Sequence, residues 1–122
     1  RTRRTMKDRD ISPTRFAHIN FIEPLGYLDF MELSIKARTV VTDSGGLQKE
    51  AYWLGVPCIT VRDETEWVET VSAGWNALVG TNREAITDAI LHMQPRATER
   101  NDFGTGHASA AIVKAIEEHI QT

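Results

Sequence analysis

The sequence predicts an α/β fold, namely a Rossmann-like parallel sheet of about four strands with helices on both faces. Short β-branched apolar runs alternate with segments of helical periodicity over short connections. The apolar runs are continuous rather than alternating, as expected for strands that are covered on both faces. Right-handed crossovers then leave few topologies. We expect one domain over residues 1–122, because a chain of this length can bury one ordinary core.

Four apolar runs are expected to form the strands, in the order Ile19–Ile22, Thr39–Thr42, Cys58–Val61 and Asn76–Gly80. Five segments with helical spacing or helix signals lie after them, namely Leu28–Ala37, Leu47–Leu54, Val68–Ala73, Thr81–Met93 and His107–Ile120. Each strand is thus followed by a helix, which is the pattern of βαβ units.

The helix ends are marked by residues with known preferences. Gly55 is expected to end the Leu47–Leu54 helix, and Pro57 prevents its restart. Gly74 stops the short helix before the fourth strand, and Thr81 or Asn82 is expected to cap the next one.

The two C-terminal helices carry apolar positions along one side. In the Thr81–Met93 segment these are Ala85, Ile86, Ala89, Ile90 and Met93. In the last helix, the spacing predicts a buried stripe formed by Ile112, Val113, Ile116 and Ile120.

Composition excludes several classes of protein. The net charge of −3 gives no electrostatic support for nucleic-acid binding. No apolar run approaches the roughly 18 residues of a membrane span, and we expect no signal peptide. The lone Cys58 reads as a small buried hydrophobe in a reducing compartment. The four histidines show no ligand spacing, so we expect no metal site.

The turn Ser44-Gly45-Gly46 stands where the Thr39–Thr42 strand gives way to a helix. In an open parallel sheet, ligands bind beyond the carboxyl ends of the strands. A helix N-terminus there presents unpaired N–H groups and about half a positive charge, which suits a phosphate. Glycines let the backbone approach the phosphate oxygens, and Ser44 can cap the helix and donate its hydroxyl.

Glu50 lies about one to two turns into the same helix, where a carboxylate suits the paired hydroxyls of a ribose. The combination is typical of a nucleoside diphosphate that lies along the start of the helix. A tight strand-to-helix turn with a surface glutamate fits the same residues, because the string is neither G-x-G-x-x-G nor a Walker A loop.

Longer strings carry a resemblance to a known family. The strings "EPLGYLDFMEL", "TDSGGLQKEAYWLGVPCITVRDETEWVETVSAGWNALVG" and "FGTGHASAAIVKAI" resemble the C-terminal half of the non-hydrolysing UDP-N-acetylglucosamine 2-epimerases. The resemblance covers nearly the whole chain, and its central stretch, residues 42–80, is far more specific than a three-residue motif.

This resemblance implies a GT-B-like enzyme with two Rossmann-like domains, of which this chain is equivalent to the C-terminal, UDP-binding one. It implies that Ser44, Gly45 and Gly46 bind the diphosphate and that Glu50 binds the ribose hydroxyls. Leu25 and Phe30 would frame the uracil.

The implied reaction interconverts UDP-GlcNAc and UDP-ManNAc, or a related UDP-2-acetamido sugar. It eliminates UDP to a 2-acetamidoglucal and adds it back, with no metal or redox cofactor. The groups that move protons are expected in a domain that precedes Arg1, so the isolated chain should be inactive. The resemblance further implies a parent isomerase that is a cytoplasmic homodimer and supplies polysaccharide precursors.

The chain departs from the family pattern at two places. Trp67 in "RDETEWVE" stands where the family commonly has an arginine that helps bind substrate, which suggests a differently decorated UDP-sugar. Thr105 and His107 are substituted in the turn "GTGHAS".

Three further residues on the ligand edge have two interpretations each. Arg62 either faces a phosphate or pairs with a neighbouring carboxylate, and Thr65 and Glu66 either contact a sugar or belong to a solvated loop.

Two other classes of function stay open. The first is the donor-binding half of a GT-B glycosyltransferase, many of which resemble each other in a second glutamate eight positions after the first; that position is Cys58 here. The second is a non-catalytic nucleotide-binding module that keeps the fold without the chemistry.

Overall fold

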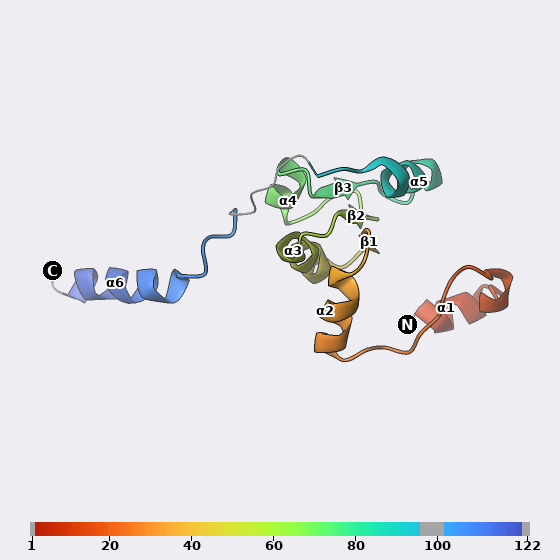
Figure 1. Cartoon of the computed structure of the whole chain (residues 1–122), viewed down its shortest axis with the longest axis horizontal. Helices are drawn as coiled ribbons and strands as arrows, with labels where there is room; N and C mark the ends of the chain where they lie inside the picture. Colours follow the sequence, from red (N-terminus) through yellow and green to blue (C-terminus); the bar gives the residue numbers. More distant parts are fainter. Residues whose placement is uncertain (1, 96–101, 121–122) are drawn as a thin grey trace. The chain divides into compact units, whose positions relative to one another are not determined.

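The computed structural model describes residues 2–95 and 102–120 (Figure 1). The chain divides into two compact units, Arg1–Phe30 and Met31–Thr122. The first unit contains the helix α1 (Thr2–Asp8), the 3-10 turn η1 (Pro13–Arg15) and the start of α2 (Tyr27–Ile35). That residues 1–122 form one domain stays a prediction.

The second unit is built on a parallel sheet of three strands, β1 (Val40–Thr42), β2 (Cys58–Thr60) and β3 (Asn76–Leu78), in the order β1-β2-β3. The register pairs Val41 with Ile59 and Ile59 with Ala77. All three strands therefore end at the same edge. The middle strand is buried at every position, which explains its continuous apolar sequence.

The expected strand at Ile19–Ile22 was wrong. These residues form no ladder with any described strand, and the amide of Ile19 donates to the carbonyl of Phe16 in a turn, at 3.0 Å. Ile19 and Ile22 are 55% and 57% exposed. An apolar run becomes a strand only where a neighbouring strand accepts and donates its backbone hydrogen bonds, and the run itself cannot supply that partner.

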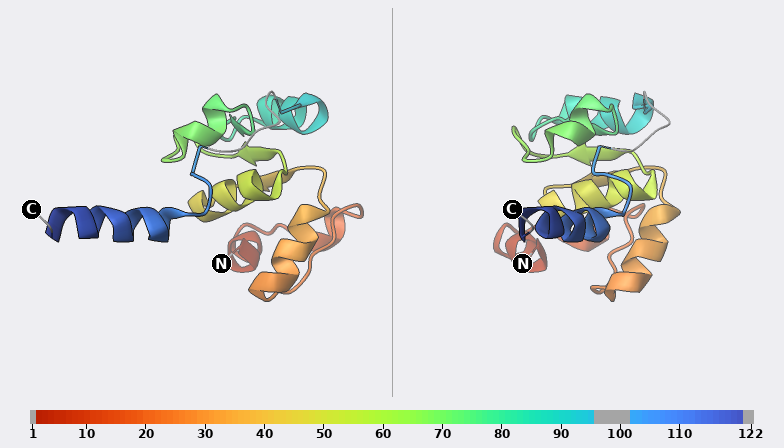
Figure 2. Two further views of the ribbon diagram at one scale, coloured as in Figure 1. Left: turned by 60° about the vertical axis from the view of Figure 1, so that its left-hand side comes forward. Right: turned by 90° about the vertical axis from the view of Figure 1, so that its left-hand side faces the viewer.

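Helices α3 (Gly45–Leu54), α4 (Val68–Ser72) and α5 (Arg83–His92) flank the sheet, as Figure 2 shows. A further helix, α6 (Ala108–Ile120), lies later in the chain. Helix α3 packs on β1 and β2, α4 packs on β3 and on α3, and α5 packs on β2. The end of α5 is fastened by the guanidinium of Arg38, which donates to the carbonyl of Leu91 at 3.1 Å. The helices predicted after each strand of the sheet are confirmed.

The predicted helix ends are confirmed. Gly55 lies at the C-cap of α3 with φ 72°, and its amide donates to the carbonyls of Ala51 and Tyr52. Only glycine adopts this left-handed backbone without strain. At the start of α5, the side chain of Asn82 accepts from the amide of Ala85 at 2.8 Å.

The core lies between α3 and the sheet. Its buried apolar members are Ala51, Tyr52, Val56, Cys58, Ile59 and Trp75. Cys58 is 1% exposed, as predicted, and burial raises the pKa of its thiol to about 11.

The prediction that the apolar stripe of the last helix is buried was wrong for the described residues. Ile112, Val113, Ile116 and Ile120 are 58%, 54%, 52% and 78% exposed, because no described element covers that side of α6. Within residues 2–95 and 102–120, no helix has the length and apolar character needed to cross a membrane.

Candidate functional site

The candidate site is the turn between β1 and α3, at the edge where the parallel strands end. Ser44 occupies the N-cap position with an extended backbone, and α3 begins at Gly45, two residues earlier than predicted. The amide of Ser44 donates to the hydroxyl oxygen of Thr42 at 3.0 Å, which fixes the turn to the end of β1.

Ser44 stands at the expected N-cap position, but its side chain makes no capping hydrogen bond. Helix geometry leaves the amides of Gly45, Gly46 and Leu47 without intrahelical carbonyls. Ser44 and Gly46 are exposed and Gly45 is half-buried. The turn thus presents a free hydroxyl and a set of backbone donors at the positive end of a helix dipole, which is an arrangement suited to an anion.

The other residues predicted for the nucleotide are divided between the two units. Glu50 lies in α3, half-buried, in the second unit with the Ser44 turn. Leu25, which is 42% exposed, and Phe30, in the first turns of α2, belong to the first unit.

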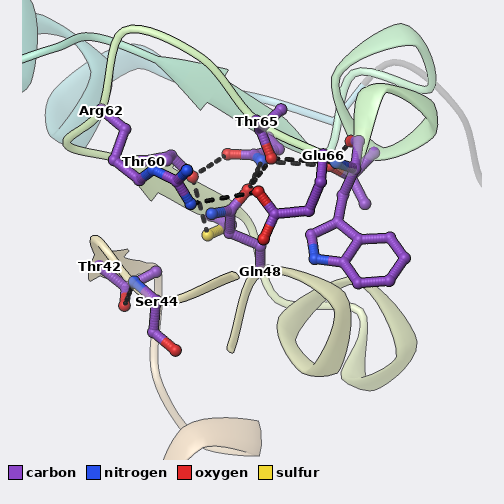
Figure 3. A network of polar contacts seen from close by, with 11 residues as sticks. Thr42, Ser44, Gln48, Thr60, Arg62, Thr65 and Glu66 are labelled. Atoms are coloured by element: carbon purple, nitrogen blue, oxygen red, sulfur yellow. Dashed lines mark hydrogen bonds and ion pairs between the residues drawn. The ribbon is translucent and has the colours of Figure 1, made fainter. Parts of the chain in front are cut away.

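The loop after β2 brings two predicted residues together. Nη1 of Arg62 lies 3.2 Å from Oε2 of Glu66, so Arg62 pairs with a carboxylate of its own loop. Oε1 of Glu66 lies against Gly45, because a Cβ built on Gly45 would overlap it. Figure 3 shows Arg62 and Glu66 reaching toward one another beside the Gln48 side chain. This loop therefore closes over the start of α3.

Thr65 serves the scaffold of this loop. Its hydroxyl donates to Oε1 of Gln48 at 2.6 Å and accepts from the amide of Trp67 at 3.1 Å. Both contacts hold the loop in a fixed conformation above α3, since Gln48 itself is fully buried.

A buried polar network extends from Gln48 to the last residue of β2 and the first residue of β3 (Figure 3). Asn76 Nδ2 donates to Gln48 Oε1 and to Thr70 Oγ1, both at 3.1 Å. Thr60 donates its hydroxyl to Asn76 Oδ1 at 2.7 Å. Such a network fixes the positions of α3, β2 and β3 relative to one another, because each buried polar group needs its partner.

Two buried donors beside the site have no hydrogen-bond partner among the described residues. They are Nε2 of Gln48 and Nε1 of Trp67. The indole nitrogen lies 3.5 Å from the place that a Cβ on Gly45 would take. An unpaired buried donor costs free energy, so its retention next to a helix N-terminus points to an acceptor that arrives with a ligand or with water.

A cation is held on the outer side of α3. The ammonium of Lys49 lies 4.9 Å from the ring centroid of Trp53, 4.4 Å from that of Trp67 and 4.7 Å from that of Phe103. Phe103 also meets Tyr52 and both tryptophans edge to face. This cluster attaches the segment around Phe103, which follows α5, to helix α3.

Sequence reasoning missed Gln48, Lys49 and the indole of Trp67 as parts of the site. Gln48 had one signal, because a neutral polar residue on the buried side of a helix requires internal partners. Lys49 had another, because Trp53 lies four positions later on the same helix face. Nothing in the sequence places Phe103 next to them.

The described residues, which omit 96–101 and the chain ends, bring together no group of three or more histidine, cysteine, aspartate or glutamate side chains that could hold a metal ion.

Comparison with known proteins identifies the family of the chain. A family model described as UDP-N-acetylglucosamine 2-epimerase matches residues 1–117. A UDP-N-acetylglucosamine 2-epimerase homolog of Methanococcus maripaludis is 47% identical over 102 residues, which are 83% of this chain and 29% of that protein. A UDP-2,3-diacetamido-2,3-dideoxy-D-glucuronate 2-epimerase of Pseudomonas aeruginosa is 41% identical over 100 residues, 80% of this chain and 28% of that protein.

Among solved structures, the UDP-GlcNAc 2-epimerase of Methanocaldococcus jannaschii in complex with UDP-GlcNAc and UDP is similar with a TM-score of 0.81 and 40% identity. The similarity covers 97% of this chain and 33% of that one. This chain therefore spans about a third of the length of the proteins it matches, and it belongs to the UDP-N-acetylglucosamine 2-epimerase family.

Proposed function

We propose that this chain is the UDP-binding domain of an isomerase that inverts C2 of a UDP-2-acetamido sugar by eliminating UDP and adding it back. The observation that carries the proposal is the Ser44-Gly45-Gly46 turn, which combines a free hydroxyl with unpaired amides at the start of a helix. It lies in a chain 40% identical to a protein solved with UDP-GlcNAc and UDP. The diphosphate is the part of the ligand that this turn suits.

The remaining contacts are those that the family resemblance assigns to the predicted residues. Glu50, further along α3, accepts hydrogen bonds from the ribose hydroxyls, and Leu25 and Phe30 frame the uracil. Arg62, beside the start of α3, supplies positive charge to a phosphate when it is not held by Glu66. Thr65 supports the loop through Gln48.

The sugar is proposed only as a class. The relatives include a UDP-N-acetylglucosamine 2-epimerase homolog and a 2-epimerase of a diacetamido-glucuronate, at 47% and 41% identity. Trp67 in place of the common arginine favours a sugar that differs from UDP-GlcNAc in its substituents.

Catalysis is proposed to need another part of the parent protein. Abstraction of the C2 proton requires a base with a tuned pKa within reach of the sugar. As the resemblance implies, we assign the proton chemistry to an N-terminal domain of the same enzyme and expect the parent to be a homodimer.

Titration calorimetry of the chain with UDP, UMP and uridine tests the proposal. We expect UDP to bind, UMP to bind more weakly and uridine to show no binding, because the diphosphate carries most of the contacts to the turn. Glu50→Ala should weaken UDP by about tenfold, since a carboxylate that accepts two hydroxyls is lost.

Glu84→Ala is the matched control, because Glu84 is an exposed glutamate in the first turn of α5. It should leave the affinity for UDP unchanged. Equal binding of UDP and uridine, or an equal loss in both variants, would contradict the assignment of the turn to the diphosphate and of Glu50 to the ribose.

A further inference from the structure

The carboxylate of Glu66 occupies the N-terminal end of α3. A Cβ on Gly45 would overlap Oε1 of Glu66 and would lie 3.1 Å from its carboxyl carbon. The absence of a side chain at Gly45 therefore leaves a space, and the space is filled by a negatively charged group from the loop after β2. A carboxylate is favoured there because it faces the positive end of the helix dipole.

Two further donors lie beside Gly45. Arg62 bonds the other oxygen of the carboxylate at 3.2 Å, and the buried, unpartnered indole N–H of Trp67 lies 3.5 Å from the Cβ position of Gly45. A guanidinium and the amides of a helix N-terminus are groups that bind phosphate in proteins, and an indole N–H is a further donor. The Glu66 carboxylate lies among these groups and pairs with Arg62, but the indole nitrogen of Trp67 remains without an acceptor.

We propose that Glu66 is an internal stand-in for the ligand's phosphate, and that a diphosphate displaces it to take over Arg62 and the indole N–H of Trp67. This inference rests on the proposed function and adds a residue that sets its affinity. The Glu66 side chain is 50% exposed, so it can rotate into solvent without any change in the backbone. Trp67 is then a donor to the phosphate in place of the arginine common in the family.

The displacement has a consequence for specificity. A ligand must compete with one carboxylate that is always present, so an incoming group with more negative charge and more acceptor oxygens has the advantage. A diphosphate has both, compared with a monophosphate. If Glu66 holds the place for about nine-tenths of the time, the apparent affinity of every phosphate ligand is reduced by about tenfold.

The test compares Glu66→Gln with Glu64→Gln by calorimetry at low ionic strength, with UDP and inorganic pyrophosphate as ligands and uridine as a control. Glu64 is exposed and lies in the same loop, and the described structure shows no hydrogen bond or ion pair for it, so its variant removes the same charge without touching Gly45. We expect Glu66→Gln to bind UDP and pyrophosphate about tenfold more tightly than the unaltered chain, and Glu64→Gln to stay within about twofold. Thermal melting confirms that each variant is folded.

The outcomes separate this inference from the proposed function. If UDP binds and Glu66→Gln binds it no more tightly than the unaltered chain does, Glu66 does not compete with the ligand, and the proposed exchange is overturned while the proposed function stands. If UDP shows no binding but pyrophosphate still binds Glu66→Gln more tightly, the anion site stands and the nucleotide function fails. If neither ligand binds Glu66→Gln, both are overturned.

Arg62→Gln provides a second variant with an expected effect of opposite sign. Arg62 is released when Glu66 leaves, so its loss should weaken pyrophosphate and UDP in the Glu66→Gln background as well as in the unaltered chain. Unchanged binding in both backgrounds would exclude Arg62 as a recipient of the phosphate and would overturn the proposed exchange.

Discussion

Gln48 connects the helix that carries the Ser44 turn to the loop after β2 and to β3. It is fully buried in α3, yet its amide oxygen accepts from Thr65 in the loop after β2 and from Asn76 at the start of β3. One side chain therefore links the helix that carries the Ser44 turn to the two neighbouring strands. The backbone donors of the Ser44 turn and the Arg62 loop are held at fixed distances because this amide is buried and bonded.

Asn76→Ala should destabilise the chain by about 2 kcal/mol, because it leaves Thr60 without its acceptor and Gln48 without one of its donors. Chemical denaturation measures the change. Asn20→Ala, at an exposed position, is the control and should alter the free energy of unfolding by less than about 0.5 kcal/mol. Equal effects of the two variants would show that the network adds nothing to stability.

Because the thiol of Cys58 is buried, we expect the stability of the chain to depend on pH. Burial raises the pKa of its thiol to about 11 in the folded chain, above that of an exposed thiol at about 8.5. Below the unfolded pKa both states hold the proton and stability is unaffected. As pH rises between the two values, only the unfolded chain releases the proton, so folding loses stability.

The free energy of unfolding should therefore fall more between pH 8 and pH 10.5 for the unaltered chain than for Cys58→Ala, by on the order of 2 kcal/mol. Denaturant melts at the two pH values measure it, and the comparison removes the contribution of lysines that titrate in the same range. Parallel curves would show that the thiol is not desolvated in solution.

At the level of residues, the sequence predicted the positions of Ser44, Gly45, Gly46 and Glu50 on the strand-to-helix unit, because that unit is a local pattern. It also offered pairing with a neighbouring carboxylate as one of two interpretations of Arg62, which is what the loop shows. It did not predict the contact between Glu66 and Gly45. That contact depends on the path of a loop that returns to α3 from the next strand, which no local pattern encodes.

Among the elements, α3 and α5 have N-caps of different kinds. Asn82 makes the capping bond of α5 at 2.8 Å, whereas Ser44 at the start of α3 makes none. A cap residue that leaves its helix uncapped retains its hydroxyl for another partner. This contrast supports a ligand role for Ser44 and a structural role for Asn82.

The two substitutions to alanine should therefore separate stability from binding. Asn82→Ala should lower the free energy of unfolding by about 1 kcal/mol and leave UDP binding unchanged. Ser44→Ala should leave stability nearly unchanged and weaken UDP binding several-fold. Thermal melts and calorimetry on both variants check this, and a large loss of stability in Ser44→Ala with unchanged binding would reverse the assignment.

The C-terminal end of α3 is a second point at which backbone geometry decides the element. Gly55→Ala should cost about 1 kcal/mol, because a φ of 72° is unfavourable for a residue with a Cβ. Gly26→Ala is the matched control, since its φ is not positive and an added Cβ there meets only Asp29, at an ordinary contact distance of 3.5 Å. Denaturation curves that shift equally would show that Gly55 is not needed for the cap.

The elements show where pattern reasoning succeeds and where it fails. Helices with a glycine or asparagine at an end were predicted to within about two residues, because capping is local. Ile19–Ile22 failed as a strand, because the hydrogen bonds of a strand come from a neighbour. The apolar side of α6 was predicted correctly as a spacing and wrongly as buried, since periodicity does not identify what covers it.

At the scale of the whole molecule, the chain spans about a third of the proteins that it matches. The donors at the Ser44 turn suit the diphosphate, and the proposed chemistry on the sugar needs an acid and a base from elsewhere in the parent. Binding and catalysis are thus proposed to lie in separate parts of one enzyme.

The isolated chain should therefore bind UDP without converting UDP-GlcNAc to its C2 epimer or releasing UDP from it. Proton NMR of the sugar over a day of incubation measures both, and the UDP-GlcNAc 2-epimerase of Methanocaldococcus jannaschii is the positive control. Conversion by the 122-residue chain alone would contradict the assignment of the proton chemistry to another domain.

Binding of the diphosphate by the Ser44 turn is tested most directly by an NMR titration of the ¹⁵N-labelled chain with UDP, followed through the backbone amides. We expect the amides of Gly45, Gly46 and Leu47 to shift most, pyrophosphate to reproduce these shifts, and uridine not to do so. Shifts of equal size throughout the chain, or shifts confined to residues away from the start of α3, would contradict the claim that this turn binds the diphosphate.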